Sequence, residues 1–389
     1  MGTTIRSSRE MSRVMQESVP RTIRPFGSRC SMVTVAGVVL VSIGLADNAQ
    51  AQSDPLPSPP VVDLHVDLPW ALYGHGDRLA DPRLATNAVR LRRGNVGMLV
   101  LPLYVHDGWK RPPGQVLADY CATYETMMNA IRSQPASGAL AQPGQAASPG
   151  RVQTMFAFEG ADGFSADPEG IAAWIAGGAC LVGLVHSHTN ALAGGSMDPD
   201  LAKRTVGLTE LGKRLARVVY RSGGLVDLAH MTDAAMRDTA LIAAEFGAPL
   251  VDTHTGMRSL RPIDRNIDDT FLRAIRDSNG VVGVDIHSGH VARVAGAVAR
   301  LDDVVRHIEH AVRVAGGEHV AIGSDLNGGI EQPSDADGAA TWPRLARKLR
   351  EKGWGDAQVS ALFEGNAQRV LGWASAHGCG KAQVHGRAQ

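Results

Sequence analysis

The sequence predicts an α/β protein built as a single TIM-type (β/α)₈ barrel, for three reasons. Eight short runs rich in Val, Ile and Leu alternate along the chain with longer stretches that have the apolar period of a helix. The runs are almost continuously apolar, which indicates strands buried on both faces, and their alternation with helices indicates parallel pairing. Eight strand–helix units close a barrel, so one domain accounts for most of the 389 residues.

The predicted elements follow in chain order. Strands are expected at residues 61–67, 98–105, 154–159, 180–187, 225–230, 250–254, 281–287 and 319–325. Helices are expected at residues 114–132, 168–176, 209–221, 232–246, 269–277 and 301–315. Residues 133–150 are rich in Ala, Gly, Gln and Pro, which predicts a solvated loop before the third strand. We expect the barrel domain to span residues 61–372 and residues 373–389 to form a loosely ordered tail.

The first 51 residues have the pattern of an export signal. An Arg-containing stretch precedes an uncharged, mostly apolar run at residues 30–46, and Ala49-Gln50-Ala51 follows as a small-x-small cleavage site. The run is shorter than the roughly 20 residues that span a bilayer. We therefore expect cleavage after Ala51, a Pro-rich linker over residues 52–60, and a periplasmic or secreted protein without a stable membrane span. Translation from one of the later Met residues of this segment stays open.

Charge and cysteine content exclude several classes of protein. The 39 Lys and Arg balance 39 Asp and Glu, but the export segment carries six of the bases and three of the acids, which leaves 33 bases and 36 acids. A slightly acidic chain with 44% hydrophobic residues is neither disordered nor a polybasic nucleic-acid binder. Cleavage leaves Cys121, Cys180 and Cys379, an odd number, so at least one thiol lies outside any disulfide within the chain. No C-x-x-C pattern indicates a cysteine metal site.

Residues that bind metals or transfer protons gather at the ends of the predicted strands. Each alone is ordinary, because a strand-end His is often structural and an Asp often caps a turn. Together they fall at one rim of the barrel, where the reacting groups of such folds lie. They are His65, Asp67, Glu159, His186, His188, His230, His254 and Asp325. Histidines and carboxylates form the ligand set that suits zinc, or less often manganese or iron, and one carboxylate can bridge two ions.

Seven short motifs, at barrel-like spacings, resemble the membrane dipeptidase (renal dipeptidase) family of zinc peptidases, family M19. The resemblance runs from about Val61 to Leu371. The motifs are Asp63-Leu-His-Val-Asp-Leu-Pro69, Phe158-Glu-Gly160, Leu184-Val-His-Ser-His-Thr-Asn190, Val226-Asp-Leu-Ala-His-Met231, His254 with Arg258 and Arg265-Asn266, Ile322-Gly-Ser-Asp325, and Gly365-Asn-Ala-Gln-Arg-Val-Leu371.

The resemblance implies a binuclear zinc site. His65 and Asp67 would hold the first Zn²⁺, His230 and His254 the second, and Glu159 would bridge the two. A water between the metals would attack the peptide bond of a dipeptide, with its pKa lowered toward about 7.

Three further roles follow from the same resemblance. Asp325 matches the carboxylate that takes the proton from this water and passes it to the leaving amine. His186 matches a substrate-contacting histidine suited to stabilising the carbonyl oxygen. Arg265 matches the residue that holds the free C-terminal carboxylate of the substrate. The neighbouring His188 could replace His186, and Arg258 or Arg261 could replace Arg265.

The chain departs from the family pattern near the expected substrate pocket. After Asp325 the family usually continues with an aromatic residue and a second acid, whereas this chain has Leu326-Asn327-Gly328. The seventh strand ends in Asp285-Ile286-His287, where relatives commonly show Asn and an aromatic residue. The preferred dipeptide, the L or D configuration at its C-terminal position and any β-lactam hydrolysis therefore depend on the shape of the pocket.

Two other functions stay open at this point. The first is another metal-dependent hydrolase on the same barrel, acting on a lactone, a cyclic amide or a phosphoester. Such enzymes commonly show His-x-His after strand one and a metal-bridging Lys, where this chain has His65-Val66-Asp67 and Glu159. The second is a non-catalytic periplasmic binding protein. The family resemblance also implies a possible homodimer.

Overall fold

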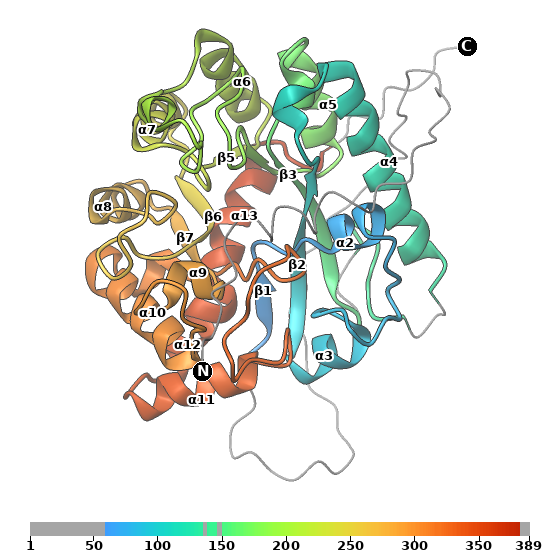
Figure 1. Ribbon diagram of the computed structural model, residues 1–389. Coiled ribbons are helices and arrows are strands. Elements are labelled where there is room, and N and C mark those ends of the chain that lie inside the picture. Colours follow the sequence, from blue (N-terminus) through green and yellow to red (C-terminus); the bar gives the residue numbers. More distant parts are fainter. Residues whose placement is uncertain (1–58, 135–137, 146–149, 382–389) are drawn as a thin grey trace, which may run out of the picture.

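The computed structural model describes residues 59–134, 138–145 and 150–381. The expected export signal and residues 52–58 of the expected linker lie outside the described residues. The described part forms a closed barrel of eight parallel strands in chain order, as the sequence predicts (Figure 1). The strands are β1 (Val61–Asp63), β2 (Val96–Tyr104), β3 (Gln153–Glu159), β4 (Leu181–Gly183), β5 (Leu225–Asp227), β6 (Val251–Thr255), β7 (Val281–Val284) and β8 (Val320–Ile322).

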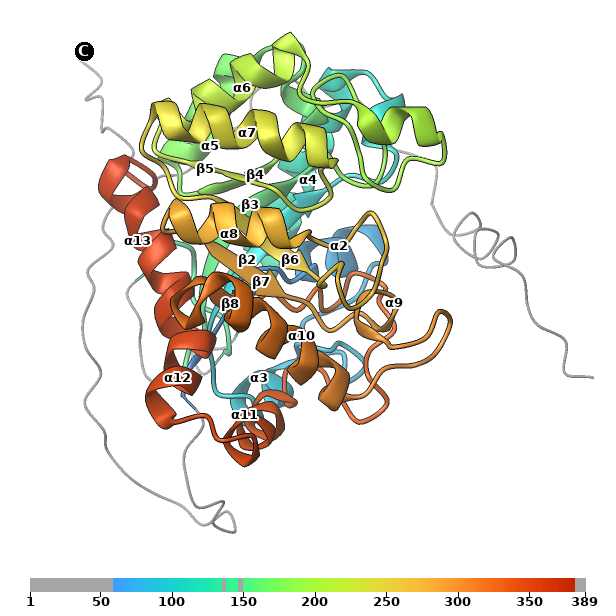
Figure 2. The ribbon, with the colours of Figure 1, turned by 90° about the vertical axis from the view of Figure 1, so that its left-hand side faces the viewer.

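Helices surround the strands on the outside of the barrel, as the side view shows (Figure 2). The α-helices are α2 (Leu68–Gly74), α3 (Ala88–Arg93), α4 (Pro113–Arg132), α5 (Ile171–Ala176), α6 (Glu210–Arg221), α7 (Asp233–Glu245), α8 (Asp269–Asp277), α9 (Ser288–Val291), α10 (Leu301–Ala315), α11 (Trp342–Glu351), α12 (Asp356–Ser360) and α13 (Asn366–His377). Shorter helical turns are η1 (Gly108–Lys110), η2 (Asp162–Phe164), η3 (Pro168–Gly170), η4 (Leu201–Thr205), η5 (Gly317–His319) and η6 (Ala361–Gly365).

Local chemistry explains where the outer helices begin. Side-chain oxygens of Thr209, Thr232 and Asp268 accept hydrogen bonds from backbone N–H groups in the first turns of α6, α7 and α8. Such caps satisfy N–H groups that have no partner within the helix. Helix α6 then buries Leu215 and Val219, which lie one helical turn apart on the same side. Among the described residues, no helix combines the length and the apolar character that crossing a bilayer requires.

Several strands are shorter than the apolar runs that predict them. Strand β1 ends at Asp63, and α2 begins at Leu68 with Pro69 in its first turn. His65 and Asp67 therefore lie in the short segment between β1 and α2 rather than within a strand. Val66 still makes a parallel bridge to Leu326, which keeps this segment in line with the barrel wall.

Two other segments differ from the expectation. The domain boundary expected at residue 372 falls inside α13, which continues to His377, and a disulfide then joins Cys379 to Cys180. The apolar pattern of this helix is weak, so its end is fixed by tertiary contacts that the sequence does not display. The expected solvated loop contains Leu140, which is buried and bridges Val152, so part of this insertion packs against the barrel.

Candidate metal centre

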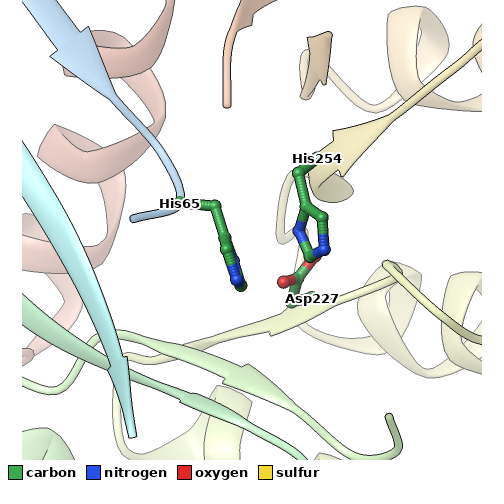
Figure 3. Close-up of side chains that lie close together, drawn as sticks. All are labelled: His65, Asp227 and His254. Carbon is green, nitrogen blue, oxygen red and sulfur yellow. The ribbon is translucent and has the colours of Figure 1, made fainter. Parts of the chain in front are cut away.

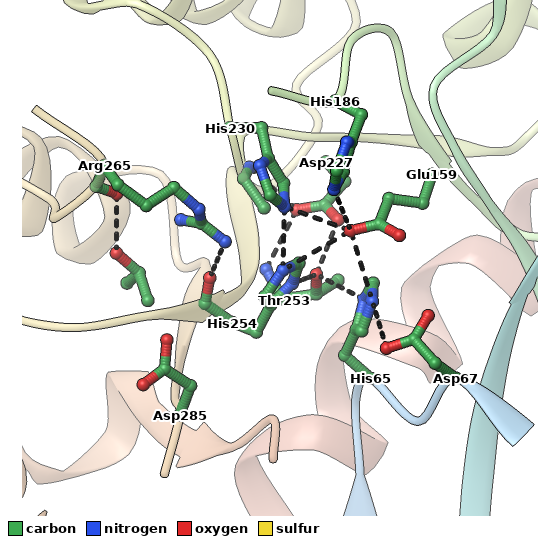
Figure 4. Close-up of polar contacts among 12 residues, drawn as sticks. His65, Asp67, Glu159, His186, Asp227, His230, Thr253, His254, Arg265 and Asp285 are labelled. Atoms are coloured by element: carbon green, nitrogen blue, oxygen red, sulfur yellow. Dashed lines mark hydrogen bonds and ion pairs between the residues drawn. The ribbon is translucent and has the colours of Figure 1, made fainter. Parts of the chain in front are cut away.

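The structure brings the predicted ligands together at the carboxyl ends of the strands. Glu159 is the last residue of β3, His230 follows β5, and His254 lies in β6. His65 and Asp67 reach the same place from the segment after β1. All five side chains are buried, with 7% exposure or less. Residues far apart in the chain therefore form one cluster at one end of the barrel (Figure 4).

The carboxylate of Glu159 lies at the centre of this cluster. Its Oε1 atom is 3.0 Å from Nε2 of His230, 3.5 Å from Nε2 of His65 and 3.6 Å from Nε2 of His254. The same Nε2 atom of His65 is 3.6 Å from Oδ2 of Asp67. The Nε2 atoms of His230 and His254 are 3.0 Å apart. Three imidazoles and two carboxylates thus direct their donor atoms into one small volume.

This arrangement fits two cations. Atoms able to bind metal lie within 4.8 Å of one another in a group formed by His65, Asp67 and Glu159, and again in a group formed by Glu159, His230 and His254. Glu159 belongs to both groups. The buried Nε2 atom of His65 has no hydrogen-bond partner, which is costly unless a ligand completes the site. Nitrogen and carboxylate oxygen donors are a set that zinc accepts.

The electrostatics of the cluster also favour cations. Burial opposes the charged form of Glu159, yet the neighbouring His186 and His65 hold the pKa of its carboxyl well below its usual range. Burial likewise opposes protonation of His65, but Asp67 and Glu159 raise its pKa well above the usual range. Asp67 and Glu159 therefore stabilise a positive charge beside them, which in a metal-free protein is a proton on His65. Burial lowers the pKa of His254 well below its usual range, so this ring is a neutral electron-pair donor.

Asp325 lies beside Asp67 at the mouth of the cluster. Its backbone has a φ of 63°, an uncommon value for a residue with a side chain, and His230 has a φ of 68°. A Cβ atom on Gly328 would lie 2.6 Å from a carboxylate oxygen of both Asp325 and Asp67, so a larger residue there would displace these carboxylates. Burial, followed by the charge of Asp67, raises the pKa of Asp325 well above its usual range. Asp325 is therefore suited to hold a proton.

The cluster opens into a pocket of about 300 Å³ whose walls are rich in aromatic and imidazole rings. His186 is the pocket histidine that reaches the cluster, because its Nε2 atom is 3.8 Å from Oε1 of Glu159. His188 instead stacks on Trp109 with ring centroids 4.5 Å apart. The geometry thus separates the two histidines, and His186 is the one that lies beside the candidate ligands.

Arg265 lies behind the candidate metal ligands and is not among the residues that line the pocket. It is 2% exposed, and its Nη2 atom donates a hydrogen bond of 2.7 Å to the carbonyl oxygen of His254. Its Nε and Nη1 atoms are buried without a hydrogen-bond partner. The competing Arg258 is committed to Asp233 through two hydrogen bonds of 2.8 and 2.7 Å. Arg265 is thus the arginine with buried donors still available near the site.

Two polar residues lie next to the candidate ligands although the sequence predicted no role for them. Asp227, the last residue of β5, lies close to His65 and His254 (Figure 3). Thr253 precedes His254, and its Oγ1 atom is 2.5 Å from Oδ2 of Asp227. Asp227 belongs to the motif that contains His230, which is a signal that could have found it. Nothing in the sequence distinguishes Thr253 from an ordinary strand residue.

Both departures from the family pattern have local partners. Asn327 donates a hydrogen bond of 2.6 Å to Oγ1 of Thr86 and accepts one of 3.0 Å from the backbone N–H of Ala85. Asp285 lies 2.6 Å from Nδ1 of His290 and is completely buried. None of these contacts involves a candidate metal ligand, so the two departures from the family pattern leave the candidate ligands in place.

The chain is similar in sequence to known proteins. Residues 52–379 match the sequence model of the family described as Membrane dipeptidase (Peptidase family M19). A Klebsiella pneumoniae protein, described as an uncharacterized protein in the pqqA 5′ region, is 35% identical over 227 residues, which make up 57% of this chain and 82% of that protein.

Solved structures show the same fold. The dipeptidase AC, a family M19 metallopeptidase, has a TM-score of 0.73 at 23% identity and covers 82% of this chain and 99% of its own. A Rhodobacter sphaeroides metallopeptidase, liganded with a phosphinate mimic of the dipeptide L-Ala-D-Ala, has a TM-score of 0.71 at 22% identity and covers 82% and 100%. Since the family match spans most of the chain, this protein belongs to the membrane dipeptidase family, peptidase family M19, and is a metal-dependent dipeptidase.

Proposed function

We propose that this protein is an exported dipeptidase that hydrolyses the peptide bond at a centre of two zinc ions bridged by Glu159. One observation carries the proposal. A single oxygen of Glu159 lies within 3.0 to 3.6 Å of an Nε2 atom from each of three buried histidines, at the floor of an open pocket. A buried carboxylate surrounded by imidazoles from three other segments is costly to maintain without bound cations.

The ligand groups suggest how the ions are divided. His65 and Asp67 would hold one ion, His230 and His254 would hold the other, and Glu159 would serve both. When bound, zinc supplies Lewis-acid polarisation of the substrate carbonyl and a water acidic enough to react at neutral pH.

Groups of this chain would supply the remaining chemistry. Asp325 can accept a proton at a carboxylate oxygen and deliver it to the departing amine, because it lines the pocket beside Asp67. His186, at the pocket side of Glu159, would donate a hydrogen bond to the carbonyl oxygen of the scissile bond. Arg265 is the candidate for holding the C-terminal carboxylate of the substrate through its buried, unpartnered Nε and Nη1 atoms, which would have to become accessible on binding because Arg265 does not line the pocket.

Export is the second half of the proposal. The disulfide between Cys180 and Cys379 supports it, because disulfides persist in oxidising compartments such as the periplasm and the extracellular space. Fractionation of cells that express the full chain, with N-terminal sequencing of the exported form, tests this part. Cleavage after Ala51 is expected, and a full-length cytoplasmic product would contradict export.

A substrate panel tests the catalytic part. Hydrolysis of L-L, L-D and Gly-D dipeptides is measured before chelation, after chelation and after zinc is restored, with a lactone and a phosphoester as competing substrates. L-Ala-D-Ala belongs in the panel because a mimic of it is bound in the Rhodobacter sphaeroides neighbour. We expect dipeptide hydrolysis that chelation abolishes and zinc restores. Activity in metal-free protein, or faster turnover of the lactone, would contradict the proposal. Light scattering on the same sample tests the homodimer that the family resemblance implies.

A further inference from the structure

The geometry points to Thr253 and Asp227 as positioning residues that hold one histidine ligand of each metal ion in the tautomer that binds metal. This inference rests on the proposed two-zinc function and extends it beyond the ligands themselves. Its central group is the hydroxyl of Thr253, which lies between three buried side chains (Figure 4).

The contacts of this hydroxyl connect both halves of the centre. The Oγ1 atom of Thr253 is 2.5 Å from Oδ2 of Asp227, 2.9 Å from Nδ1 of His254 and 3.3 Å from Nδ1 of His65. These four residues are 4% exposed or less. The contacts are therefore shielded from bulk water, and each polar atom depends on the others for its hydrogen bonds.

Counting hydrogens assigns the direction of each bond. A hydroxyl has one hydrogen and two acceptor positions. Backbone N–H groups of Thr253 and Ala229 already donate to Oδ1 of Asp227, at 2.9 and 3.1 Å, which leaves Oδ2 to accept the hydroxyl hydrogen. The two acceptor positions of Oγ1 then face Nδ1 of His65 and Nδ1 of His254. Both Nδ1 atoms must carry hydrogen to make these bonds.

This assignment orients the electron pairs of both ligands. A neutral imidazole with its hydrogen on Nδ1 has a free electron pair on Nε2. Nε2 is the atom through which His65 and His254 approach Oε1 of Glu159, at 3.5 and 3.6 Å. The hydroxyl of Thr253 thus sets the tautomer of His65, a ligand of the first ion, and of His254, a ligand of the second. Hydrogen bonds of this kind commonly strengthen metal binding.

A direct metal role for Asp227 is less consistent with these contacts. Potential metal-binding atoms of His65, Asp227 and His254 do lie within 4.8 Å of one another (Figure 3). However, the Thr253 hydroxyl is within hydrogen-bonding distance of all three side chains and already fills the space that an ion would need. The group is therefore a hydrogen-bonding centre behind the ligands.

The backbone explains how Thr253 and its neighbour His254 both reach the centre. Consecutive residues of a regular strand point to opposite faces. Between Asp252 and Thr255, however, β6 gains one residue relative to β7, which is a β-bulge. A Cβ atom on Gly283 or Gly323 would lie within 2 Å of the carbonyl oxygen of Thr253. These two glycines make room for the bulged backbone.

His230 provides an internal contrast. Its Nδ1 atom is buried without a hydrogen-bond partner, so no comparable group among the described residues sets its tautomer. Loss of the Thr253 hydroxyl should therefore weaken the binding of both ions, of one through His65 and of the other through His254, although Thr253 itself binds neither ion.

The test measures zinc affinity, which does not depend on turnover. Zinc is competed from the parent protein and from Thr253→Val with a chromogenic chelator, and the metal content is determined after gel filtration. We expect both equivalents to bind roughly 10- to 100-fold more weakly in Thr253→Val. Thr253→Ser keeps the hydroxyl and should restore parental affinity. Thr239→Val, a buried threonine on α7 whose hydroxyl bonds to Ala235, is the matched control and should bind zinc as the parent does.

Two further outcomes separate the possible failures. Parental affinity in a folded Thr253→Val would overturn the inference while leaving the two-zinc dipeptidase intact, whereas a parent protein that binds no zinc would overturn the proposed function itself. If Thr253→Val does not fold, nitrogen NMR of histidine-labelled, zinc-loaded parent protein decides the question. Hydrogen on Nδ1 of both His65 and His254 is expected, and hydrogen on Nε2 of either ring would contradict the assignment.

Discussion

At the carboxyl ends of the barrel strands, ionisable side chains crowd together with 7% exposure or less, and one carboxylate oxygen approaches three imidazoles. At the amino ends, a disulfide joins Cys180, just before β4, to Cys379, just after α13. Asn366 of α13 also donates hydrogen bonds of 2.8 Å to the carbonyl oxygens of Gly317 and Val320 at the start of β8. The carboxyl end of the barrel therefore buries charge at a cost in stability, while the amino end is stabilised by a disulfide and by hydrogen bonds.

Changes at the two ends of the barrel should therefore affect the protein differently. Substitutions at the carboxyl end should reduce activity with little loss of stability, and those at the amino end should reduce stability with little loss of activity.

Glu159→Gln should give the largest effect. An amide lacks the negative charge that two ions would share, so kcat/KM for a dipeptide should fall at least about a thousandfold, which corresponds to roughly 4 kcal/mol. Steady-state kinetics with metal analysis on the same sample measure this. Glu169→Gln changes an exposed acid that pairs with Arg221 and should leave kcat/KM unchanged. Equal kcat/KM in Glu159→Gln and Glu169→Gln would contradict the assignment of activity to the carboxyl ends of the strands.

Cys379→Ser should act at the other end. Removing the disulfide is expected to lower the free energy of unfolding by about 2 to 5 kcal/mol, because the link closes a loop between residues 199 positions apart. Urea denaturation measures this, with Cys121→Ser on α4 as the control. The folded variant should keep parental kcat/KM at 25 °C, and a selective loss of activity would contradict the separation of the two ends.

Arg265→Lys should weaken recognition of the substrate carboxylate. Replacing the forked guanidinium by an ammonium keeps the charge but loses the bidentate contact, which is expected to cost about 2 to 3 kcal/mol in kcat/KM for a dipeptide. The corresponding dipeptide amide, which lacks the carboxylate, should be hydrolysed equally by the parent and the variant. Arg261→Lys is the control, because Arg261 makes one long contact of 3.4 Å to the carbonyl oxygen of Gly289. An equal loss on dipeptide and amide would assign Arg265 a purely structural role.

Asp162→Asn should give the smallest effect, and in the stabilising direction. Burial raises the pKa of Asp162 to about 6, so the folded protein holds its proton more tightly than the unfolded chain. The parent therefore loses stability from this group as pH rises from about 4 to about 6, and the loss persists above that range. At pH 7, metal-free Asp162→Asn should be more stable than the parent by up to about 3 kcal/mol, the value of a shift of about two pKa units. Chemical denaturation at pH 4 and pH 7 checks this, since the difference should vanish at the lower pH.

The barrel and the approach of its ligands were predictable because a parallel barrel brings every strand end to one rim. His65, Glu159, His230 and His254 could be placed there from the apolar runs that precede them. The position of Thr253 beside the candidate ligands was not predictable, because a bulge in β6 turns two consecutive side chains toward the site. Periodicity also failed at α13 and its disulfide, where long-range contacts rather than a local pattern determine the structure.

The position of Arg265 shows a different limit. Its spacing from His254 fits the family motif, but its burial behind the ligands depends on the loop between β6 and α8. Likewise, His186 and His188 lie two residues apart, and only the loop geometry after β4 sends one to Glu159 and the other to Trp109. Loop conformation therefore determines the positions of those site residues that the sequence alone does not fix.

Stepwise zinc titration of metal-free protein tests the central claim most directly. Hydrolysis of a dipeptide is followed while zinc is added in fractions of an equivalent. A two-ion centre bridged by Glu159 predicts no activity at the start and a rise that saturates at two equivalents per chain. Full activity without metal, or saturation at one equivalent, would contradict the binuclear centre.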